Sequence, residues 1–382
     1  MSPSELAVAL GHARERTLTL LEPLSDDQLT AQVSPLQSPL VWDLAHIGHF
    51  EELWLLRRVG GQNGGSSDGD RLYDAFAHGR AERGSLPFLS PAAARDYVAE
   101  VREGVLRLLP ELALDDGDPL LRGGLLVGMV AQHELQHVET MTQTLELGSL
   151  SGPAPLGPPE VEASGDVLVS EGSFALGSDD PWAYDNERPA HSVDLPGFRI
   201  DRALVTNAEY AAFVDDGGYR DRAAWSDEGW RWRETENAVA PFNWELPGDR
   251  YLLRRFDAVE PLPLREPVQH LSFHEAETYA RWAGKRLPTE PEWEKAARTT
   301  GSELEHLRGA VWQWTASTFE AYPGFRAFPY PEYSEPFFGD GYKVLRGGSW
   351  VTDPLVSRPT FRNWDLPGRR QIFSGLRCVS DV

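Results

Sequence analysis

A run of proline and glycine between residues 149 and 164 divides the chain into two halves of different character. It reads Ser-Leu-Ser-Gly-Pro-Ala-Pro-Leu-Gly-Pro-Pro-Glu-Val-Glu-Ala-Ser, a composition that excludes a helix and is typical of a linker. With 382 residues the chain is long enough for two or three domains. We therefore predict an α+β multidomain protein with one domain over residues 1–150 and another over residues 165–382.

The charge balance limits the classes of partner. The chain has 36 Lys and Arg against 59 Asp and Glu, a formal net charge of −23, and no visible basic patch. We therefore expect no nucleic acid and no anionic membrane surface among its partners. The single cysteine, Cys378, excludes an intramolecular disulfide framework and is expected to be buried. Because no run of about 18 apolar residues and no export signal is visible, we expect a soluble, cytoplasmic protein.

The first half has helical periodicity. In four stretches apolar residues recur three and four positions apart. Ser38 and Ser90 each precede a proline, a pair that marks a helix start. We predict a four-helix bundle, with helices over residues 4–21, 38–58, 90–109 and about 120–147. The long polar loop between the second and third helices, from Gly60 to Leu89, is of a length typical of functional or disordered segments.

Histidines on two of these helices suggest a metal site. His133 and His137 are four residues apart and so share a helix face, and His46 on the second helix is the candidate third ligand. His49 could replace His46, although we expect it to face neighbouring polar groups. Three imidazoles leave three positions open on an octahedral ion, which suits iron(II) with oxygen and substrates as further ligands.

Two other interpretations of the histidines stay open at this point. A pair of histidines four residues apart also occurs by chance on an exposed helix. With Glu134 the pair forms His-Glu-x-x-His, the pattern of zinc metalloproteases. Such a protease needs a third ligand soon afterwards in the chain, and none is present.

The second half predicts an irregular α+β domain rich in loops. Short β-like runs occur at Asp166–Val169, Phe198–Ile200 and Tyr342–Leu345, and one clear helix runs from His274 to Ala283. Seven motifs follow in order, beginning at Glu171 (EGSFALG), Pro189 (PAHSV), Val205 (VTNAEY), Arg286 (RLPTEPEWE), Val311 (VWQWT), Leu345 (LRGGSW) and Gly375 (GLR). The series resembles the formylglycine-generating-enzyme family, which is built on a C-type-lectin-like fold. Its formylglycine-forming members use paired cysteines, so that activity is excluded here.

The first half, with Trp42-Asp-Leu-Ala-His46 and the histidine pair, resembles the DinB-like helical bundle. Joined in this order, the halves resemble the EgtB-type sulfoxide synthases of ergothioneine biosynthesis over nearly the whole chain. The resemblance implies an iron(II)-dependent oxidoreductase that uses O2 to couple C2 of hercynine, the trimethylated betaine of histidine, to a thiol. It also implies three iron ligands, namely His46, His133 and His137.

The resemblance implies roles for further residues. Gln136 would approach the hercynine imidazole, and Asn363 and Trp364 its trimethylammonium group. Trp364 could equally be a core residue, but an indole face does recognise a quaternary ammonium. Tyr330 would be the catalytic proton donor, with Tyr333 in contact with substrate and Tyr322 as the competing donor.

The sulfur donor implied by the resemblance is γ-glutamylcysteine. Arg80 and Arg83 would clamp its carboxylates, Asp365 would meet its ammonium, and Arg369 a carboxylate. Arginine forks suit carboxylates because they form two parallel charge-assisted hydrogen bonds. The alternative for Arg80 and Arg83 is that they merely solvate a surface loop.

Two alternative functions remain. The stretch between Trp293 and Trp312 is shorter than usual for the family, a feature shared with selenoneine synthases, which join hercynine to a selenosugar. A different class of function is a non-catalytic ligand-binding protein stabilised by a metal. The sequence does not determine the oligomeric state.

Overall fold

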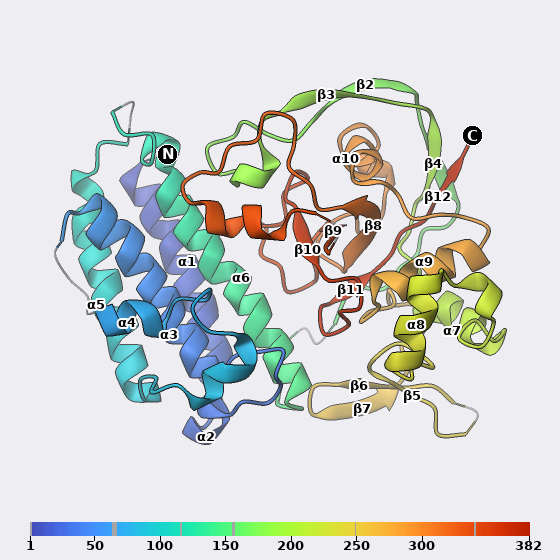
Figure 1. Ribbon diagram of the computed structural model, residues 1–382, viewed down its shortest axis with the longest axis horizontal. Coiled ribbons are helices and arrows are strands. Elements are labelled where there is room, and N and C mark those ends of the chain that lie inside the picture. The colour runs from blue at the N-terminus through green and yellow to red at the C-terminus, as the bar shows by residue number, and fades with distance from the viewer. Residues whose placement is uncertain (1, 63–66, 115–116, 155–156, 249, 340) are drawn as a thin grey trace. The chain divides into compact units, whose positions relative to one another are not determined.

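The computed structural model describes residues 2–62, 67–114, 117–154, 157–248, 250–339 and 341–382 (Figure 1). The chain divides into two compact units, Met1–Pro153 and Ala154–Val382. Among the described residues, none of the helices combines the length and the apolar character that a bilayer-spanning helix needs.

The first unit is the predicted helical bundle. Its α-helices are α1 (Pro3–Leu21), α2 (Asp26–Thr30), α3 (Leu40–Glu51), α4 (Ser67–Leu72), α5 (Pro91–Leu108) and α6 (Leu125–Leu147). Short 3-10 helices occur at Arg80–Ser85, Leu109–Glu111 and Arg122–Gly124. The four long helices lie side by side, α1 along α6 and α3 against both α5 and α6 (Figure 1). Ser2 and Ser90 cap the starts of α1 and α5 through their hydroxyl groups, and each precedes a proline.

The bundle departs from the prediction at three helix ends. Helix α3 begins at Leu40 with Pro39 as its N-cap and no side-chain cap, so the predicted start at Ser38 is wrong. The last helix begins at Leu125 rather than near residue 120, because Gly123 and Gly124 have φ angles of 62° and 77°. A Cβ atom at Gly124 would lie 2.8 Å from the Leu6 side chain, so this turn needs glycine. The second helix is α-helical only to Glu51 and continues as a π-helix over Glu52–Val59.

A buried cluster of four charges joins the four long helices, one from each. Arg14 of α1 donates to Glu134 of α6 at 2.7 Å and to Glu51 of α3 at 2.9 Å. Arg102 of α5 donates to the same two carboxylates, at 3.0 Å and 2.6 Å. All four side chains are buried. Because each charge has two partners of opposite sign, the cluster fixes the relative register of the helices.

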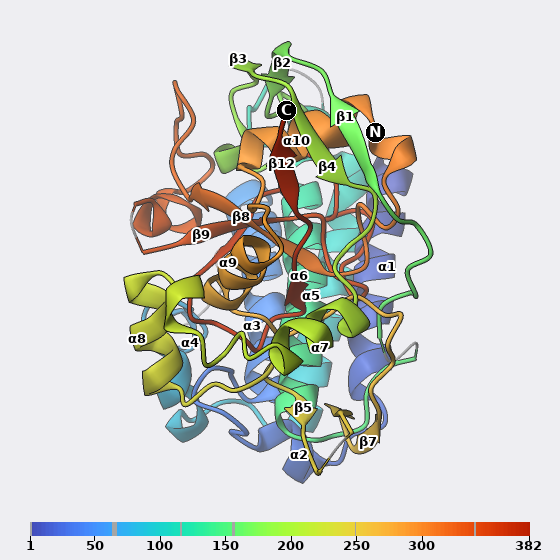
Figure 2. The ribbon, with the colours of Figure 1, turned by 90° about the vertical axis from the view of Figure 1, so that its right-hand side faces the viewer.

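The second unit is an α+β domain of small sheets. Its strands are β1 (Asp166–Val169), β2 (Gly172–Leu176), β3 (His191–Leu195), β4 (Phe198–Asp201), β5 (Trp244–Glu245), β6 (Leu252–Arg255), β7 (Ala258–Pro261), β8 (Trp312–Thr318), β9 (Lys343–Arg346), β10 (Asn363–Asp365), β11 (Ser374–Gly375) and β12 (Val379–Asp381). They form sheets in the orders β1-β4-β12, β2-β3, β5-β6-β7 and β10-β9-β8-β11. Figure 2 shows β1, β4 and β12 side by side. The three predicted strands occur in this set as β1, β4 and β9.

The helices of this unit are more numerous than predicted. They are α7 (Asn207–Asp215), α8 (Asp227–Thr235), α9 (Phe273–Trp282) and α10 (Glu290–Thr299). Only α9 was expected. One hydrophobic core packs α10, through Trp293 and Ala296, against β1 and β4. Cys378 is buried, as predicted. The end of the proline-rich segment lies on this unit, where the backbone N–H of Val161 donates to the Arg265 oxygen at 2.9 Å.

Candidate metal centre

Three histidines of the bundle converge. His46 of α3 and His133 and His137 of α6 present ligand nitrogens that all lie within 4.8 Å of one another. Their ring centroids are separated by 5.1 Å, 4.8 Å and 4.6 Å. An imidazole triad is a common donor set for a divalent transition metal. The structure thus brings together the three histidines that the sequence singled out, and the residues present fit a metal ion.

Oxygen atoms lie close to the Nδ1 atoms of two of the rings. The Nδ1 atom of His46 lies 2.7 Å from the backbone oxygen of Tyr73, and donation to that oxygen leaves Nε2 for a metal. The Nδ1 atom of His137 lies 3.3 Å from Oδ1 of Asp43, a buried carboxylate. The Oδ2 atom of Asp43 has no hydrogen-bond partner in the part of the chain that the structure describes. A carboxylate beside an imidazole is a usual partner of a metal-binding histidine.

Two of the imidazoles, those of His46 and His133, are held in the form that binds metals. Burial lowers the pKa of His46 and of His133 well below the usual range of histidine, and the nearby His137 adds to both shifts. Both rings are therefore neutral at pH 7, as ligation requires. The ring of Phe50 stacks on His133, with centroids 3.8 Å apart. His49 is not part of the triad, since its Nε2 atom lies 3.8 Å from Asp70 instead.

The half-buried face of α6 carries the candidate ligands. His133, Gln136, His137 and Thr140 are half-buried, whereas the residues between them are buried in the bundle. Gln136 therefore shares a face with both histidines. Glu134 lies on another face, where it is 2% exposed and bound by two arginines. It is not available as a general base, so the metalloprotease interpretation is wrong.

Trp42 links the metal centre to one of the predicted substrate-binding arginines. Its indole stacks on the His46 ring, with centroids 5.0 Å apart and an interplanar angle of 10°. The guanidinium carbon of Arg83 lies 3.9 Å from the indole centroid, a cation–π contact. Arg83 thus contacts Trp42, which in turn stacks on the candidate ligand His46.

Arg83 is part of the fold and not a loop side chain in solvent. It is 5% exposed and donates to the Ser38 hydroxyl at 2.8 Å and to the backbone oxygens of Ala75 at 2.9 Å and His78 at 3.1 Å. Burial lowers its pKa to about 10. The surface-loop interpretation is therefore wrong for Arg83. Arg80 is exposed, and its Nη1 donates to the Leu36 oxygen at 3.1 Å.

Three predicted residues of the second unit meet in an aromatic cluster, namely Tyr330, Tyr333 and Trp364. The Tyr333 ring lies 6.2 Å from that of Tyr330 and 5.6 Å from that of Trp364, both edge to face. Phe319 stacks on Trp364 with centroids 4.2 Å apart. Asn363 is the neighbour of Trp364 on strand β10, and Trp364 is half-buried. Trp364 is therefore partly packed and partly open.

Strand β10 is held by a buried ion pair just before it. Arg362 donates from Nε and Nη2 to the two oxygens of Glu290, at 2.7 Å and 3.0 Å. Arg346 donates to the same carboxylate at 2.9 Å. Beyond the strand start, Asp365 and Arg369 face each other, with Oδ1 and Nε 3.8 Å apart. These two predicted substrate residues are thus placed together on one turn.

The two candidate proton donors differ in their surroundings. Burial raises the pKa of Tyr330 well above its usual range, and also that of Tyr322. Both phenols are therefore protonated at pH 7. Tyr322 is buried, Arg362 lies 4.1 Å from its ring centroid, and its hydroxyl has no hydrogen-bond partner among the described residues. Tyr330 is half-buried in a loop that Asp185 anchors through Ser334 Oγ at 2.5 Å.

Both units of the chain match known protein families. Residues 9–141 match the DinB superfamily, and residues 154–307 and 300–382 match the Sulfatase-modifying factor enzyme 1-like domain. Hercynine oxygenase of Mycolicibacterium thermoresistibile is 47% identical, covering 99% of this chain and 95% of its own. The chain belongs to the hercynine oxygenase family. Hercynine oxygenases of Mycolicibacterium smegmatis and Mycobacterium tuberculosis are 46% and 45% identical over 99% and 100% of this chain.

Membership of the hercynine oxygenase family confirms several predictions. The two-part fold, with a DinB-like bundle and a formylglycine-generating-enzyme-like domain, is confirmed, and so is the prediction of an oxidoreductase.

Other contributors to the site were missed by sequence reasoning, namely the Tyr73 carbonyl, Asp43 and Phe50. Asp43 and Phe50 lie within one turn of His46 and His49 on α3, a spacing that could have indicated them. No sequence pattern indicates that the backbone oxygen of Tyr73 would lie beside His46.

Proposed function

We propose that the protein uses O2 to join hercynine to a thiol, with iron(II) held by His46, His133 and His137. Family membership supports hercynine and O2 as substrates. The observation that carries the proposal is the convergence of the ligand nitrogens of three imidazoles within 4.8 Å of one another. Iron(II) would supply the redox chemistry with O2, which protein side chains alone do not provide.

The reaction that we propose forms a bond between C2 of hercynine and the sulfur of γ-glutamylcysteine, and it oxidises that sulfur to a sulfoxide. C2 and the thiol each lose one hydrogen. One oxygen atom of O2 stays on sulfur, and the other leaves as water with the two hydrogens. The protein must therefore orient both substrates and deliver protons to the departing oxygen atom.

We assign hercynine binding to Gln136, Asn363 and Trp364. A carboxamide such as Gln136 offers both a donor and an acceptor to an imidazole, and its place beside His133 and His137 on α6 supports this role. The half-buried indole of Trp364 suits a trimethylammonium group, which has no hydrogen-bond donors and binds aromatic faces.

We assign proton delivery to Tyr330, with Tyr333 in contact with substrate. The raised pKa of Tyr330 keeps its phenol protonated, so it can act as a general acid at neutral pH. Tyr333 supports the loop position of Tyr330 by packing between it and Trp364. Tyr322 is the weaker candidate because it is only 7% exposed.

We assign the charged groups of γ-glutamylcysteine to Arg80, Arg83, Asp365 and Arg369. Arg80 is exposed. Arg83 has no carboxylate within ion-pair distance among the described residues, so a substrate carboxylate would be its ion-pair partner. Asp365 Oδ1 and Arg369 Nε lie 3.8 Å apart, so one turn presents both an acidic group for the substrate ammonium and a basic group for a substrate carboxylate. A desolvated arginine gains most from a paired anion.

One experiment tests the proposed function. The protein is loaded with iron(II) without oxygen and then given air and hercynine together with γ-glutamylcysteine, cysteine or a selenosugar, and the products are identified by mass spectrometry. We expect the sulfoxide of the hercynine–γ-glutamylcysteine conjugate. A selenium conjugate formed faster would make the protein a selenoneine synthase. Binding of hercynine without any product would favour the non-catalytic alternative.

A further inference from the structure

The short helix α4 docks on α3 through two consecutive backbone oxygens. The Nε1 of Trp42 donates to the Leu72 oxygen at 3.1 Å, and the Nδ1 of His46 donates to the Tyr73 oxygen at 2.7 Å. Trp42 and His46 are one turn apart on α3 and their rings stack, so both N–H groups reach the end of α4. The position of α4 thus decides where one candidate iron ligand is held.

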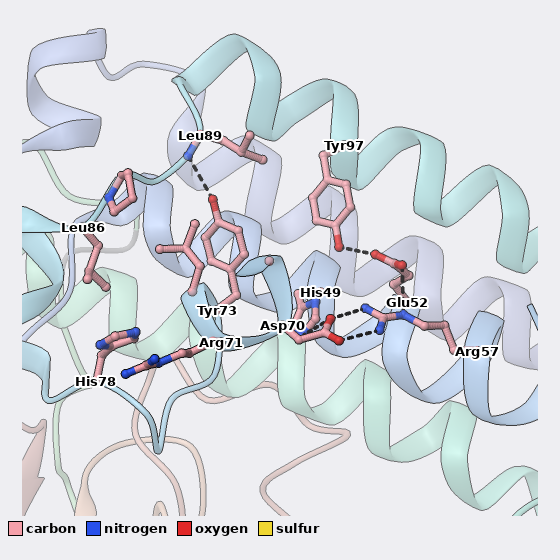
Figure 3. Close-up of a pocket in the computed structure, with 13 residues that line it drawn as sticks. His49, Glu52, Arg57, Asp70, Arg71, Tyr73, His78, Leu86, Leu89 and Tyr97 are labelled. Carbon is pink, nitrogen blue, oxygen red and sulfur yellow. Dashed lines mark hydrogen bonds and ion pairs between the residues drawn. The ribbon is translucent and has the colours of Figure 1, made fainter. Parts of the chain in front are cut away.

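A helix of six residues has little stability of its own, because helix nucleation is costly. One side of this segment also borders a pocket of about 640 Å³, which Asp70 and Tyr73 help to line (Figure 3). Specific contacts must therefore hold α4 in place. One of them is a fork in which Arg57 donates from Nη1 and Nη2 to the two oxygens of Asp70, at 3.0 Å and 2.6 Å.

The π-helix explains how Arg57 reaches this position. Residues five apart lie on well-separated faces of an α-helix but come together in a π-helix, whose hydrogen bonds span five residues. Glu52 and Arg57 are five apart, and Arg57 Nε donates to Glu52 Oε1 at 3.0 Å. Tyr97 of α5 donates to the other oxygen of Glu52 at 2.5 Å (Figure 3). Arg57 is thereby fixed on one side and free to bind Asp70 on the other.

We propose that Arg57 and Asp70 are positioning residues for the metal centre, which hold α4 so that the Tyr73 oxygen fixes the His46 ring with Nε2 toward the metal. This inference rests on the proposed metal centre. The pairing raises the pKa of Arg57 and lowers that of Asp70, so both groups remain charged at neutral pH. The π-helix that continues α3 and the segment of α4 thus help to hold His46, a candidate metal ligand, in place.

Cobalt(II) titration tests the inference, with visible absorption as the readout. Arg57→Ala and Asp70→Ala should each raise the Kd for cobalt(II) about tenfold, the low end of what loss of an outer partner of a metal ligand costs. Because the two residues act through one contact, the double variant should bind cobalt(II) no more weakly than either single variant. The absorption bands of the bound ion should shift in all three, since the His46 ring is less constrained.

Arg71→Ala is the matched control, because Arg71 is an exposed arginine on the same helix that also lines the pocket. It should leave the Kd and the spectrum unchanged. Thermal unfolding of each metal-free variant separates a local effect from loss of the fold. An unchanged Kd in Arg57→Ala or Asp70→Ala, additive effects in the double variant, or an equal effect of Arg71→Ala would overturn the inference. If the parent protein binds no metal, the proposed function fails as well. If the parent binds metal and forms the sulfoxide, the proposed function stands, and a negative result with the variants overturns only the positioning role of Arg57 and Asp70.

Discussion

Arg14 Nε donates a hydrogen bond to Oε1 of Glu134 at 2.7 Å, inside the bundle. Glu134 is the neighbour of His133 in the sequence, yet its side chain lies on another helix face and is bound there by Arg14 and Arg102. The His-Glu-x-x-His sequence therefore has two separate uses. The histidines form the candidate metal centre, and the glutamate belongs to the charged core that joins the helices.

The first prediction concerns this charged core. Glu134→Gln should lower the free energy of unfolding by about 3 to 5 kcal/mol, because it leaves two buried guanidinium groups short of a counter-charge. Urea denaturation measures the change. Glu103→Gln is the control, since Glu103 pairs with Arg107 at the surface and both side chains are 73% exposed. That variant should lose at most about 1 kcal/mol. Equal losses in the two variants would contradict a special role for the core.

The second prediction concerns the metal. Replacing His46, His133 or His137 by Ala should abolish stoichiometric iron(II) binding, because two remaining imidazoles hold the ion weakly. His49→Ala should keep most of the iron, since His49 faces Asp70. Iron content after gel filtration measures both. Retention of iron by His133→Ala would remove the basis of the proposed mechanism.

The third prediction concerns pH and the loop that carries Tyr330. Burial raises the pKa of Asp185 to about 6, from an ordinary value of 3.8. A carboxyl with a raised pKa in the folded state favours folding when protonated, so its contribution is full below about pH 4 and is lost as the pH rises to 6. Asp185→Asn keeps the neutral form at all pH values. Its stability relative to the parent should therefore rise between pH 4 and 6, as urea denaturation will show.

A hydroxyl next to Asp185 supplies the control. Ser334 Oγ donates to Oδ1 of Asp185, and this bond opposes the effect of burial on the pKa. Ser334→Ala should therefore raise the pKa of Asp185 further and move the pH window upward. A stability difference between the parent and Asp185→Asn that does not vary between pH 4 and 6 would refute the assignment.

Much of the bundle could be predicted because local rules govern it. Ser90 followed by proline marks the start of α5, and a spacing of four residues places His133 and His137 on one face. The same rule fails at Ser38, which does not cap α3 and instead accepts a hydrogen bond from Arg83. The same rules also mark α7 and α10, which the prediction missed. Thr206 with Glu209, and Thr289 with Glu292, form capping boxes at their starts.

The remainder depends on contacts between distant parts of the chain. The interpretation of Arg83 as a loop residue failed because its burial comes from Trp42, 41 positions earlier, and its acceptors include backbone oxygens. The π-helix is equally hidden. Its sequence, Glu52–Val59, reads as an ordinary continuation of α3, and the pairing of Arg57 with Asp70 only becomes visible in three dimensions.

The fourth prediction concerns the proton donor. Tyr330→Phe should leave the KM for hercynine within about twofold of the parent but divert O2 toward oxidation of the thiol alone, because the ring packing stays and the hydroxyl is lost. Tyr322→Phe is the matched control in a neighbouring loop. Product ratios from mass spectrometry and oxygen consumption measure the effect. An unchanged sulfoxide yield in Tyr330→Phe, with a loss in Tyr322→Phe, would transfer the role to Tyr322.

The last prediction concerns the sulfur donor. γ-Glutamylcysteine brings two carboxylates and an ammonium group, whereas a selenosugar brings none of these charges. Arg83→Ala would also remove the cation over Trp42, so the more exposed Arg80 and Arg369 give the clearer test. Loss of one partner of a desolvated charge pair costs about 2 to 5 kcal/mol.

The variant with Arg80→Ala and Arg369→Ala should therefore raise the KM for γ-glutamylcysteine at least about tenfold, because its carboxylates are left unpaired. The KM for hercynine should stay close to that of the parent, since its proposed contacts are neutral side chains. Arg71→Ala, which removes an exposed arginine from the same unit as Arg80, should change neither constant. Steady-state kinetics with each substrate varied in turn provide the measurement. Unchanged use of γ-glutamylcysteine by the double variant, or a preference of the parent for a selenosugar, would refute the assignment of the donor, and the metal centre would stand independently of that result.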